Sequence, residues 1–464
     1  MTQNHFDLIV IGSGPAGEVG AIRAAQLGLK VALIEKQAHL GGTCLNWGCI
    51  PTKALLESAK QYDKFKHAEE LGFGIGKLSY HWDVIMKRKE TVVDQQRKGL
   101  RFLMKKNKIE VFEGHGRLKD KNTVTVSPSA GGTVTSITAK SILLCMGSRV
   151  RELPFAKANG KGILNSDSVL SIDSIPESLC IIGGGVVGME FASLFGRFGS
   201  QVTVIEVGAQ ILPSEDEEVV KDFERLVKKQ NVSIECNQKV SKIDDQGSKV
   251  EVTTEDGKKR SFSRVLVSVG REPVSQDCGL EGVGVKMDRG FVVVDDHYKT
   301  NIPNIFAVGD LIPTPALAHT ASAEALHAVE IIAGHHPTKI NYKANPSAIY
   351  TYPEVASIGD TEKTLKTKGI AYKSTKFPFA PMAKAKIEGA TDGFIKILYD
   401  PKYRELLGVH IINARATEMI AEFALGKNLE TTVDEIGSTI HPHPTLSETI
   451  MEAAHAAVGG AIHM

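Results

Sequence analysis

The sequence of 464 residues predicts an α/β protein in which one strand–turn–helix–strand unit occurs twice. Three observations predict this fold class. A glycine-rich turn pattern is repeated, an apolar run of strand length precedes each copy, and a stretch of helical character follows each copy. The chain is long enough for about three domains with large buried cores.

The two copies of the unit share a GxGxxG turn and an acidic residue at the end of the second strand. These positions are Gly12, Gly14, Gly17 and Glu35 in the first copy and Gly183, Gly185, Gly188 and Glu206 in the second. In both copies 23 positions separate the first glycine from the acid. A lone GxGxxG is a weak signal, but the strand and helix around it make each copy specific.

This pattern predicts that each unit binds a dinucleotide. The first glycine permits a tight turn, the second lets the backbone approach a pyrophosphate, and the third lets helix and strand pack closely. The start of the helix offers N–H groups and a positive dipole end to the phosphates. We therefore expect two Rossmann-like dinucleotide-binding domains, in which Glu35 and Glu206 accept hydrogen bonds from ribose hydroxyls.

The stretch after Glu206 favours NAD(H) over NADP(H). No lysine or arginine occurs between this acid and Lys221. A site for the 2′-phosphate of NADP needs a basic residue here, and the carboxylate of Glu206 would repel that phosphate.

A third element indicates that the other dinucleotide contains a flavin. The apolar run 305–308 ends at Gly309 and Asp310, and helical character resumes at about Ala318. An aspartate at a strand end can hold the ribityl or phosphate part of a flavin by hydrogen bonds. A strand followed by Gly-Asp is also an ordinary turn, so the residues alone leave both interpretations open.

The six cysteines are too few for a fold stapled by disulfides. Cys145 and Cys180 lie in apolar runs, and we expect them to be buried thiols. Cys44 and Cys49 lie instead in a glycine-rich segment. As half of a metal site they would need a second Cys or His pair at zinc spacing, and the sequence has none. We therefore predict a thiol/disulfide redox pair and no metal site.

The spacing of Cys44 and Cys49 predicts an interrupted helix. On a regular helix, residues i and i+5 have Cα atoms roughly 8–9 Å apart, whereas a disulfide requires less than about 7 Å. Gly48 has the conformational freedom to allow the distortion. Pro51 suits the first turn of a helix that we expect to run to about Tyr62. Cys49 would then lie near a positive helix end, which favours its thiolate.

The run 441–448, with the sequence HPHPTLSE, has two interpretations. A neutral imidazole can take a proton from a thiol, and a carboxylate can orient that imidazole. The run also has the composition of a proline-broken loop with surface histidines. Composition alone favours the loop, and spacing cannot decide.

Composition also argues against several classes of partner. The net charge is +1 and there is no long basic run, so we expect no nucleic-acid and no membrane-surface binding. No apolar stretch reaches the roughly 18 residues of a spanning helix. The segment 1–5 lacks the basic region of a targeting peptide, so we expect a cytoplasmic protein.

Two motifs make the chain resemble a known family. The segment 41–53, GGTCLNWGCIPTK, and the run 441–448 are similar to those of the dihydrolipoamide dehydrogenases, which are class I pyridine nucleotide-disulfide oxidoreductases. The resemblance covers essentially the whole chain. It implies an FAD-binding domain at 1–148, an NAD-binding domain at 149–272, a central domain at 273–342 that completes the FAD site, and a C-terminal α+β dimerisation domain at 343–464.

The resemblance also implies an activity, the oxidation of protein-bound dihydrolipoamide to lipoamide, with hydride passed through FAD to NAD⁺. His443 would be the catalytic base and Glu448 its orienting partner. In this family the histidine reaches the flavin site of the other subunit, so a homodimer is implied. The further implied partners are lipoyl domains and the acyltransferase core of 2-oxoacid dehydrogenase complexes, or the glycine cleavage system.

Further roles carry over by position. Cys44 would be the thiol that exchanges with the substrate, and Cys49 would form the thiolate beside the flavin. Lys53 would lie near the flavin and pair with Glu190.

The remaining implied residues contact the two cofactors. For FAD they are Glu35, Lys36, Gly42, Thr43, Lys53, Gly116, Asp310 and Ala318, in addition to the first glycine turn. For NAD they are the second glycine turn with Val186, and Glu206, Val240 and Gly270.

The chain departs from the family pattern at three places that bear on flavin and nicotinamide packing. Cys145-Met146-Gly147 replaces Ala-Thr-Gly, Val274 stands where asparagine is common, and Val207-Gly208 replaces bulkier residues. None of these is a redox or proton-transfer position.

Related enzymes and one different class are the alternatives. Glutathione and trypanothione reductases prefer NADPH, which the stretch 207–211 disfavours, and mercuric reductases add a C-terminal cysteine pair that this sequence lacks. A non-catalytic flavoprotein subunit should have lost Cys44, Cys49 or His443, and all three are present.

Overall fold

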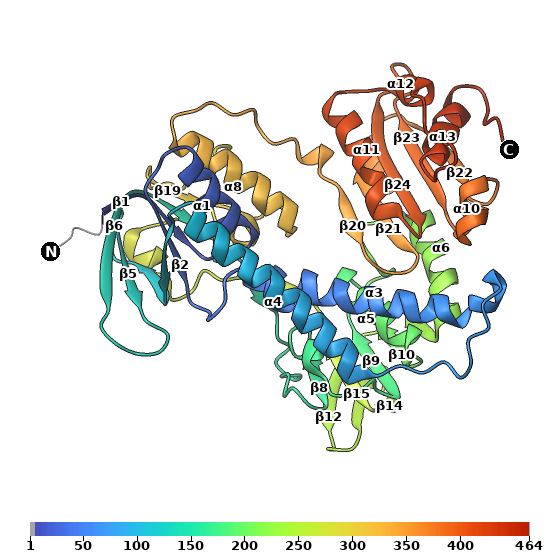
Figure 1. Ribbon diagram of the computed structural model, residues 1–464, viewed down its shortest axis with the longest axis horizontal. Coiled ribbons are helices and arrows are strands. Elements are labelled where there is room, and N and C mark those ends of the chain that lie inside the picture. The colour runs from blue at the N-terminus through green and yellow to red at the C-terminus, as the bar shows by residue number, and fades with distance from the viewer. Residues whose placement is uncertain (1–4, 464) are drawn as a thin grey trace. The chain divides into compact units, whose positions relative to one another are not determined.

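The computed structural model describes residues 5–463, and the expectation drawn from the first residues lies largely outside this part. The described chain divides into two compact units (Figure 1). Unit 1 contains the segment up to Ala54, Asp83–Arg151 and Gly270–Ile340. Unit 2 contains Leu55–Trp82, Glu152–Val269 and the segment from Asn341 onward.

Unit 1 is built on a seven-stranded sheet with the order β3-β2-β1-β6-β5-β4, in which β19 also pairs with β6. Strands β1, β2, β3, β6 and β19 are parallel, and β4, β5 and β6 form an antiparallel meander. The strands are β1 His5–Ile11, β2 Val31–Glu35, β3 Glu110–Glu113, β4 His115–Leu118, β5 Thr123–Ser127, β6 Thr135–Leu144 and β19 Ile305–Ala307. All five residues of β2 are buried, as expected for a parallel strand covered on both faces.

Two helices of unit 1, α1 (Pro15–Gln26) and α8 (Ala318–Ile332), pack side by side against this sheet (Figure 1). Helix α2 spans Gly42–Trp47, and α3 (Cys49–Lys66) and α4 (Trp82–Lys106) continue from one unit into the other along the chain. The smaller elements are β7 Ser148–Val150 paired with β16 Arg271–Pro273, β17 Met287–Asp288 paired with β18 Phe291–Val292, and α7 Leu280–Val283.

Unit 2 contains a second parallel sheet, with the order β11-β10-β9-β15-β8. Its strands are β8 Ile163–Asn165, β9 Ser178–Ile182, β10 Gln201–Ile205, β11 Val232–Glu235 and β15 Arg264–Val267. Helices α5 (Val186–Arg197) and α6 (Glu217–Val227) follow β9 and β10. An antiparallel sheet of β12 Val240–Asp245, β13 Val250–Thr254 and β14 Lys259–Phe262 precedes β15.

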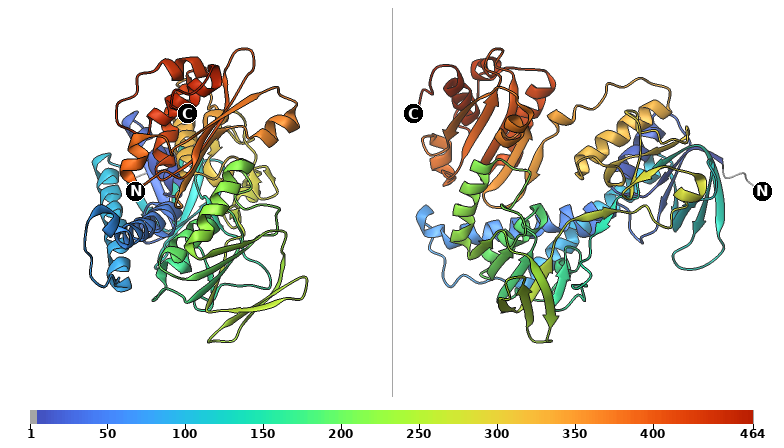
Figure 2. Two further views of the ribbon diagram at one scale, coloured as in Figure 1. Left: turned by 90° about the vertical axis from the view of Figure 1, so that its right-hand side faces the viewer. Right: turned by 180° about the vertical axis from the view of Figure 1, so that it is seen from behind.

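The C-terminal part of unit 2 is an antiparallel sheet covered by helices. The strand order is β20-β21-β24-β23-β22, with β20 Ser347–Ile349, β21 Glu354–Gly359, β22 Lys373–Pro378, β23 Phe394–Tyr399 and β24 Leu406–Asn413. The helices are α9 Glu362–Lys368, α10 Ala383–Glu388, α11 Ala416–Asn428, α12 Val433–Ser438 and α13 Glu448–Val458. Helices α11 and α13 share one apolar core with this sheet, and the left view of Figure 2 shows the red helices on one side of the orange strands.

These elements confirm the predicted fold class of two Rossmann-like units and a C-terminal α+β region. The apolar runs before both glycine turns are strands β1 and β9, and the helix expected from Ala318 begins at that residue. Helix α3 is longer than predicted, since it begins at Cys49 and ends at Lys66. No glycine or second proline follows Pro51 before Gly72, so nothing in the sequence stops this helix at Tyr62.

A buried lysine connects α6 and α9 to the C-terminal sheet within unit 2. Lys396 lies on β23 with its side chain 3% exposed, and its Nζ lies 2.8 Å from Asp216, 3.0 Å from Glu218 and 3.0 Å from Glu362. Burial, the largest single effect, opposes ionisation of Asp216 and Glu362, but the hydrogen bonds and positive charges around them, those of Lys396 foremost, together outweigh it and lower the pKa of each carboxyl. Such a buried cation is costly to desolvate and stabilises only while all its partners remain.

Replacing this lysine should therefore destabilise the protein. We expect Lys396→Met to lower the free energy of unfolding by about 3 kcal/mol, because it leaves the buried carboxylate of Asp216 without its cation. The half-exposed Lys376, 3.5 Å from Glu218, provides the control, and Lys376→Met should cost less than about 1 kcal/mol. Urea unfolding followed by circular dichroism measures both, and equal midpoints for the two variants would contradict this account.

The pH dependence of the same comparison has a defined sign. Carboxyls whose pKa is lowered on folding contribute stability above their unfolded pKa of about 4, and this contribution is lost as the pH falls through the lower folded value. The difference between wild type and Lys396→Met should therefore shrink below about pH 4.

Candidate active site

The first glycine turn is shaped by close backbone packing in unit 1. A Cβ added at Gly12, whose φ is +98°, would lie 2.3 Å from the carbonyl oxygen of Cys145. A Cβ added at Gly17 would lie 1.8 Å from the carbonyl oxygen of Gly12. Gly14 is the N-cap of α1, and the N–H groups of a helix's first turn, here apart from Pro15, can bind an anion. Strand β1 therefore meets the start of α1 as closely as a dinucleotide turn requires.

The acid at the end of β2, Glu35, is hydrogen-bonded to this turn. Buried Glu35 accepts hydrogen bonds through Oε2 from the N–H and the hydroxyl of Ser13, at 3.0 and 2.6 Å, and through Oε1 from the N–H of Gln37 at 2.8 Å. Oε1 holds one of these bonds and keeps capacity for a further donor. A ribose hydroxyl fits that requirement.

The second glycine turn, in unit 2, repeats this geometry. A Cβ at Gly183 would lie 2.4 Å from the carbonyl oxygen of Ser268, and one at Gly188 would lie 2.1 Å from the carbonyl oxygen of Gly183. No heavy atom of the described residues lies within 4 Å of a Cβ added at Gly185, the N-cap of α5. This open space at a helix N-terminus fits a pyrophosphate.

The acid of the second turn is held in the same way. Glu206 accepts hydrogen bonds from the N–H groups of Gly184 and Gly208, both at 2.6 Å, one on each carboxylate oxygen. Each oxygen keeps capacity for one more donor. Both turns therefore fit the dinucleotides that the sequence predicts.

The helix break predicted between the two cysteines is confirmed. Helix α2 ends at Trp47, Gly48 has φ −137° and ψ −113°, and α3 begins at Cys49. A Cβ at Gly48 would lie 2.9 Å from the carbonyl oxygen of Thr43. Cys44 lies in α2 and Cys49 at the first position of α3, where the helix dipole favours a thiolate.

The cysteine-bearing helix α2 starts directly on the first glycine turn. The N–H of Gly41 donates to the carbonyl oxygen of Ser13 at 3.0 Å and lies 3.1 Å from its hydroxyl. A Cβ added at Gly42 would lie 2.6 Å from the Cα of Gly14. The redox pair and the predicted pyrophosphate site therefore share one rigid junction.

The two thiols interact, and both are half-buried. A hydrogen bond with Cys49 is the largest cause that raises the pKa of Cys44, followed by burial, the charge of Cys49 and the charge of Glu18, while Lys53 acts in the opposite direction. The charge of one thiolate of the pair therefore opposes formation of the second. The other cysteines expected to be buried, Cys145 and Cys180, are buried.

Glu18 is a member of this cluster that the sequence analysis missed. An acid in the first turn of a helix usually complements the helix dipole, so its position gave no signal of a redox role. The usable signal was its place directly after the third glycine of a turn that a cysteine segment follows.

The Gly309-Asp310 turn is a 3-10 helix, and its aspartate belongs to a polar network of unit 1. The hydroxyl of Ser148 donates to Asp310, and the Nε of Arg271 donates to that hydroxyl at 2.7 Å. Arg271 also reaches the hydroxyl of Thr43, at 3.5 Å. The network places Asp310 and the cysteine helix α2 on one site, as a shared cofactor would require.

The remaining predicted contacts lie at the ends of elements. Lys36 is exposed just after β2, and Gly116 is buried in β4. The first residues of α8, α5 and β12 are Ala318, Val186 and Val240. Gly270, with φ +110°, immediately precedes β16. Their contacts with cofactors stay predictions.

The predicted proton-transfer pair is formed in unit 2. The Nδ1 of His443 lies 2.8 Å from the Oε1 of Glu448, and the imidazole is exposed while the carboxylate is largely buried. Burial opposes ionisation of Glu448, but the N–H of Thr445 and the imidazole of His443 outweigh it and lower its pKa. The carboxylate fixes the proton on Nδ1, which leaves Nε2 as the basic nitrogen.

The neighbouring histidine has other partners. His441 lies between the carbonyl oxygen of Thr439 and the carboxylate of Glu422, both at 2.9 Å. The structure thus distinguishes the two histidines, which composition could not do.

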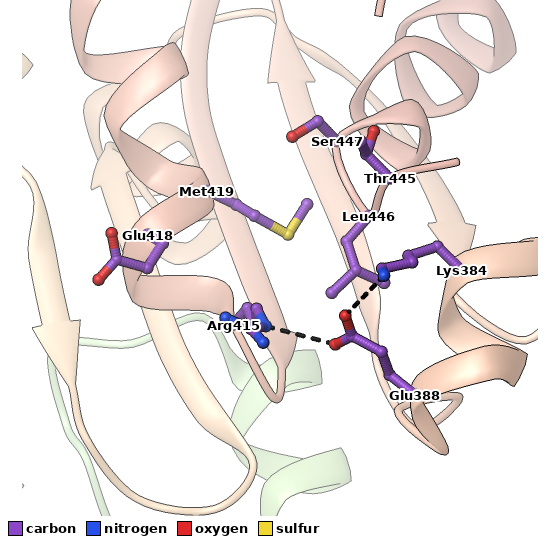
Figure 3. A pocket seen from close by; sticks show the side chains of 8 residues that line it. All are labelled: Lys384, Glu388, Arg415, Glu418, Met419, Thr445, Leu446 and Ser447. Carbon is purple, nitrogen blue, oxygen red and sulfur yellow. Dashed lines mark hydrogen bonds and ion pairs between the residues drawn. The ribbon is translucent and has the colours of Figure 1, made fainter. Parts of the chain in front are cut away.

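A pocket of about 250 Å³ lies next to this segment and not at His443. Its lining residues are Lys384, Glu388, Arg415, Glu418, Met419, Thr445, Leu446 and Ser447. Figure 3 shows the carboxylate of Glu388 between the cations of Lys384 and Arg415. Both cations of the pocket therefore already have a carboxylate partner, and His443 is not among the lining residues.

The predicted pair of Lys53 and Glu190 joins residues of different units. Within unit 2, Glu190 is buried in α5, and its Oε1 accepts a hydrogen bond from the N–H of Tyr350 at 3.1 Å. The pairing itself stays a prediction.

Two kinds of site are absent from the described residues. No group of three or more His, Cys, Asp and Glu side chains in this part of the chain is arranged to hold a metal ion. Between residues 5 and 463, no helix combines the length and apolar character needed to cross a membrane.

Comparison with known families identifies the fold and its site together. The sequence profile described as pyridine nucleotide-disulphide oxidoreductase matches residues 6–325, and the profile of that family's dimerisation domain matches residues 345–454. The chain belongs to this family. Its members are FAD- and NAD(P)-dependent, which confirms the predicted cofactor classes.

Individual relatives agree with this assignment. The chain is 42% identical to a dihydrolipoyl dehydrogenase of Zymomonas mobilis and 41% identical to one of Bacillus subtilis, and each alignment covers 99% of both chains. Among solved structures, LpdA from Mycobacterium tuberculosis aligns with a TM-score of 0.92 at 27% identity, over 97% of this chain and 99% of that one. The HOCl-induced flavoprotein disulfide reductase RclA of Escherichia coli aligns with a TM-score of 0.87 at 26% identity, over 97% and 99%.

The junction of α2 with the glycine turn can be tested by adding one methyl group. We expect Gly42→Ala to lose most bound flavin, because its Cβ would lie 2.6 Å from the Cα of Gly14. Gly28→Ala is the matched control, since Gly28 also has a positive φ but open space around it. Both variants carry backbone strain of about 1 kcal/mol, so flavin absorbance per protein isolates the effect of crowding. Equal flavin content in the two variants would show that the junction does not support the site.

Proposed function

We propose that the chain is an NAD-dependent dihydrolipoyl dehydrogenase that oxidises protein-bound dihydrolipoamide to lipoamide. The observation that carries the proposal is the interacting, half-buried pair of Cys44 and Cys49, in the helix segments next to the first dinucleotide turn. The chain that carries this pair is about 40% identical to enzymes of that name. The likeness to the HOCl-induced reductase is weaker, at 26% identity.

In the proposed reaction His443 and Cys44 act on the substrate thiols. Nε2 of His443, held by Glu448, takes the proton of one thiol, and the resulting thiolate attacks Sγ of Cys44 in the Cys44–Cys49 disulfide. Cys49 leaves as the thiolate, which the N-terminus of α3 favours. The second substrate thiol then loses its proton to water, and its thiolate attacks the mixed disulfide, forms the disulfide of lipoamide and releases Cys44 as a thiolate.

The chain's own residues suit the two cofactors. The first glycine turn, Glu35 and Asp310 would hold FAD, and the second glycine turn and Glu206 would hold NAD. When bound, FAD accepts the two electrons of the thiols and NAD⁺ removes them as hydride. The exposed Val207 beside Glu206 offers no cation to a 2′-phosphate, which supports NAD over NADP.

The wider assembly is part of the same proposal. A match to a dimerisation domain supports a homodimer, in which His443 would serve the cysteines of the partner subunit. We further propose lipoyl domains and an acyltransferase core as partners. We also propose that the chain forms four domains, with boundaries near residues 148, 272 and 342, and that the protein is cytoplasmic.

The assay is NAD⁺ reduction by dihydrolipoamide, with NADP⁺ as the comparison acceptor. We expect Cys49→Ser to lower kcat at least about 1000-fold, because the substrate's electrons then have no disulfide to enter. The half-buried Cys236 is the control, and Cys236→Ser should keep wild-type turnover. Normal turnover in Cys49→Ser, or glutathione disulfide reduction with NADPH in place of lipoamide chemistry, would overturn the proposal.

A further inference from the structure

Glu18 is an acidic residue beside the redox pair to which the proposed reaction assigns no role. It lies in the first turn of α1, where its N–H donates to the carbonyl oxygen of the N-cap Gly14 at 2.9 Å. Its side chain is half-buried, and burial raises its pKa to about 7. Glu18 therefore changes charge in the neutral range, unlike an ordinary glutamate.

The packing of two helix starts places Glu18 and Cys44 near one junction. Helix α1 begins after Gly14 and α2 after Gly41, and the near contact of Gly42 with Gly14 leaves no room for a side chain between them. Glu18 is the fourth residue of α1 and Cys44 the third of α2, so each lies within one turn of this junction. The charge of Glu18 acts on Cys44 and raises its pKa.

The other charged groups around Cys44 are the thiol of Cys49, which opposes its ionisation, and the cation of Lys53, which favours it. Helix α8, which packs along α1, carries titratable residues with partners of their own. Glu324 accepts a hydrogen bond from the N–H of Gly309, and His327 lies between His297 and Thr338. Glu330 pairs with Arg23 and His335. His319 lies in the first turn of α8. Among the charged groups that shift the pKa of Cys44, Glu18 is the carboxylate.

We propose that Glu18 is a positioning residue that controls the charge of the Cys44 thiol, by taking up a proton when Cys44 becomes a thiolate and releasing it when Cys44 is protonated or disulfide-bonded. The proposal rests on the proposed role of Cys44 as the thiol that exchanges with the substrate. Coupling between two acids is reciprocal, so a thiolate at Cys44 raises the proton affinity of Glu18 as much as the carboxylate opposes the thiolate.

Protons and electrons balance in the step that releases Cys44. The second substrate thiol releases its proton to water, its thiolate attacks the mixed disulfide, the disulfide of lipoamide forms, and the bond to Cys44 breaks with its electron pair left on Sγ. Glu18 binds one proton from water at this point, which offsets the negative charge of the Cys44 thiolate. When the Cys44–Cys49 bond forms again, Glu18 returns that proton to water. No further oxidant or reductant is needed.

The test is the pH profile of Cys44 alkylation in the full-length, FAD-loaded protein. A Cys49→Ser background leaves Cys44 as the one thiol of the pair, and iodoacetamide labelling of the Cys44 peptide, measured by mass spectrometry, gives its thiolate fraction. In this background we expect Glu18→Gln to move the midpoint about one pH unit lower, and labelling below the midpoint to rise about tenfold.

Glu110→Gln is the matched control, because it removes one carboxylate from an exposed position on β3 of the same unit. Its profile should overlay that of the Cys49→Ser background. Overlapping profiles for Glu18→Gln and Glu110→Gln would overturn the proposal, because a purely structural Glu18 would leave the midpoint in place.

A second measurement avoids the substitution if Glu18→Gln fails to retain flavin. Infrared difference spectra of the Cys49→Ser protein should show a protonated carboxyl band that titrates near pH 7 and changes when Cys44 is alkylated. A titration that alkylation leaves unchanged would overturn the proposal. Wild-type turnover with dihydrolipoamide separates the two claims: its absence removes the proposed function, whereas normal turnover with an unshifted Cys44 profile removes the role of Glu18 alone.

Discussion

The contact between the starts of α1 and α2 is the constraint on which the rest of unit 1 depends. Gly41 donates its N–H to Ser13, and Gly42 lies so close to Gly14 that one methyl group would not fit between them. The helix that carries Cys44 therefore begins on the turn that is shaped for a pyrophosphate. A redox pair placed this way has a short route to any flavin held by the same turn.

The interruption at Gly48 completes this arrangement. It separates α2 from α3, so that Cys44 and Cys49 lie on two short helical segments and can interact although five positions separate them. It also makes Cys49 the first residue of a long helix, while Cys44 remains inside its own. The two thiols consequently have different positions relative to a helix N-terminus, which is the basis for the different roles proposed for them.

The duplication shows which features belong to dinucleotide binding and which to redox chemistry. Both turns use glycines against carbonyl oxygens, and both acids accept N–H groups of their own turn. Only the first copy is followed by a cysteine segment. The common geometry therefore accounts for two cofactors, and the segment 41–53 accounts for the disulfide chemistry.

The sequence predicted the parts of this structure that depend on local backbone geometry. Glycine turns, the strands before them and the break at Gly48 follow from steric rules that hold wherever the segment lies. Features that depend on packing between distant segments were not predictable: the sequence around Lys396 does not show that this lysine is buried, and Glu18 has the position of an ordinary helix-start acid. Their partners are set by tertiary structure, which local pattern does not contain.

The most direct test of the central claim is an anaerobic titration of the FAD-loaded enzyme with dihydrolipoamide, in which thiols are trapped and assigned by mass spectrometry. One dihydrolipoamide per chain should convert Cys44 and Cys49 from a disulfide to two alkylatable sulfurs, while the other cysteines stay unchanged. Addition of NAD⁺ should then restore the disulfide and yield one NADH per chain. NADH formation without any change at Cys44 and Cys49, or no reduction of this pair by dihydrolipoamide, would contradict the account.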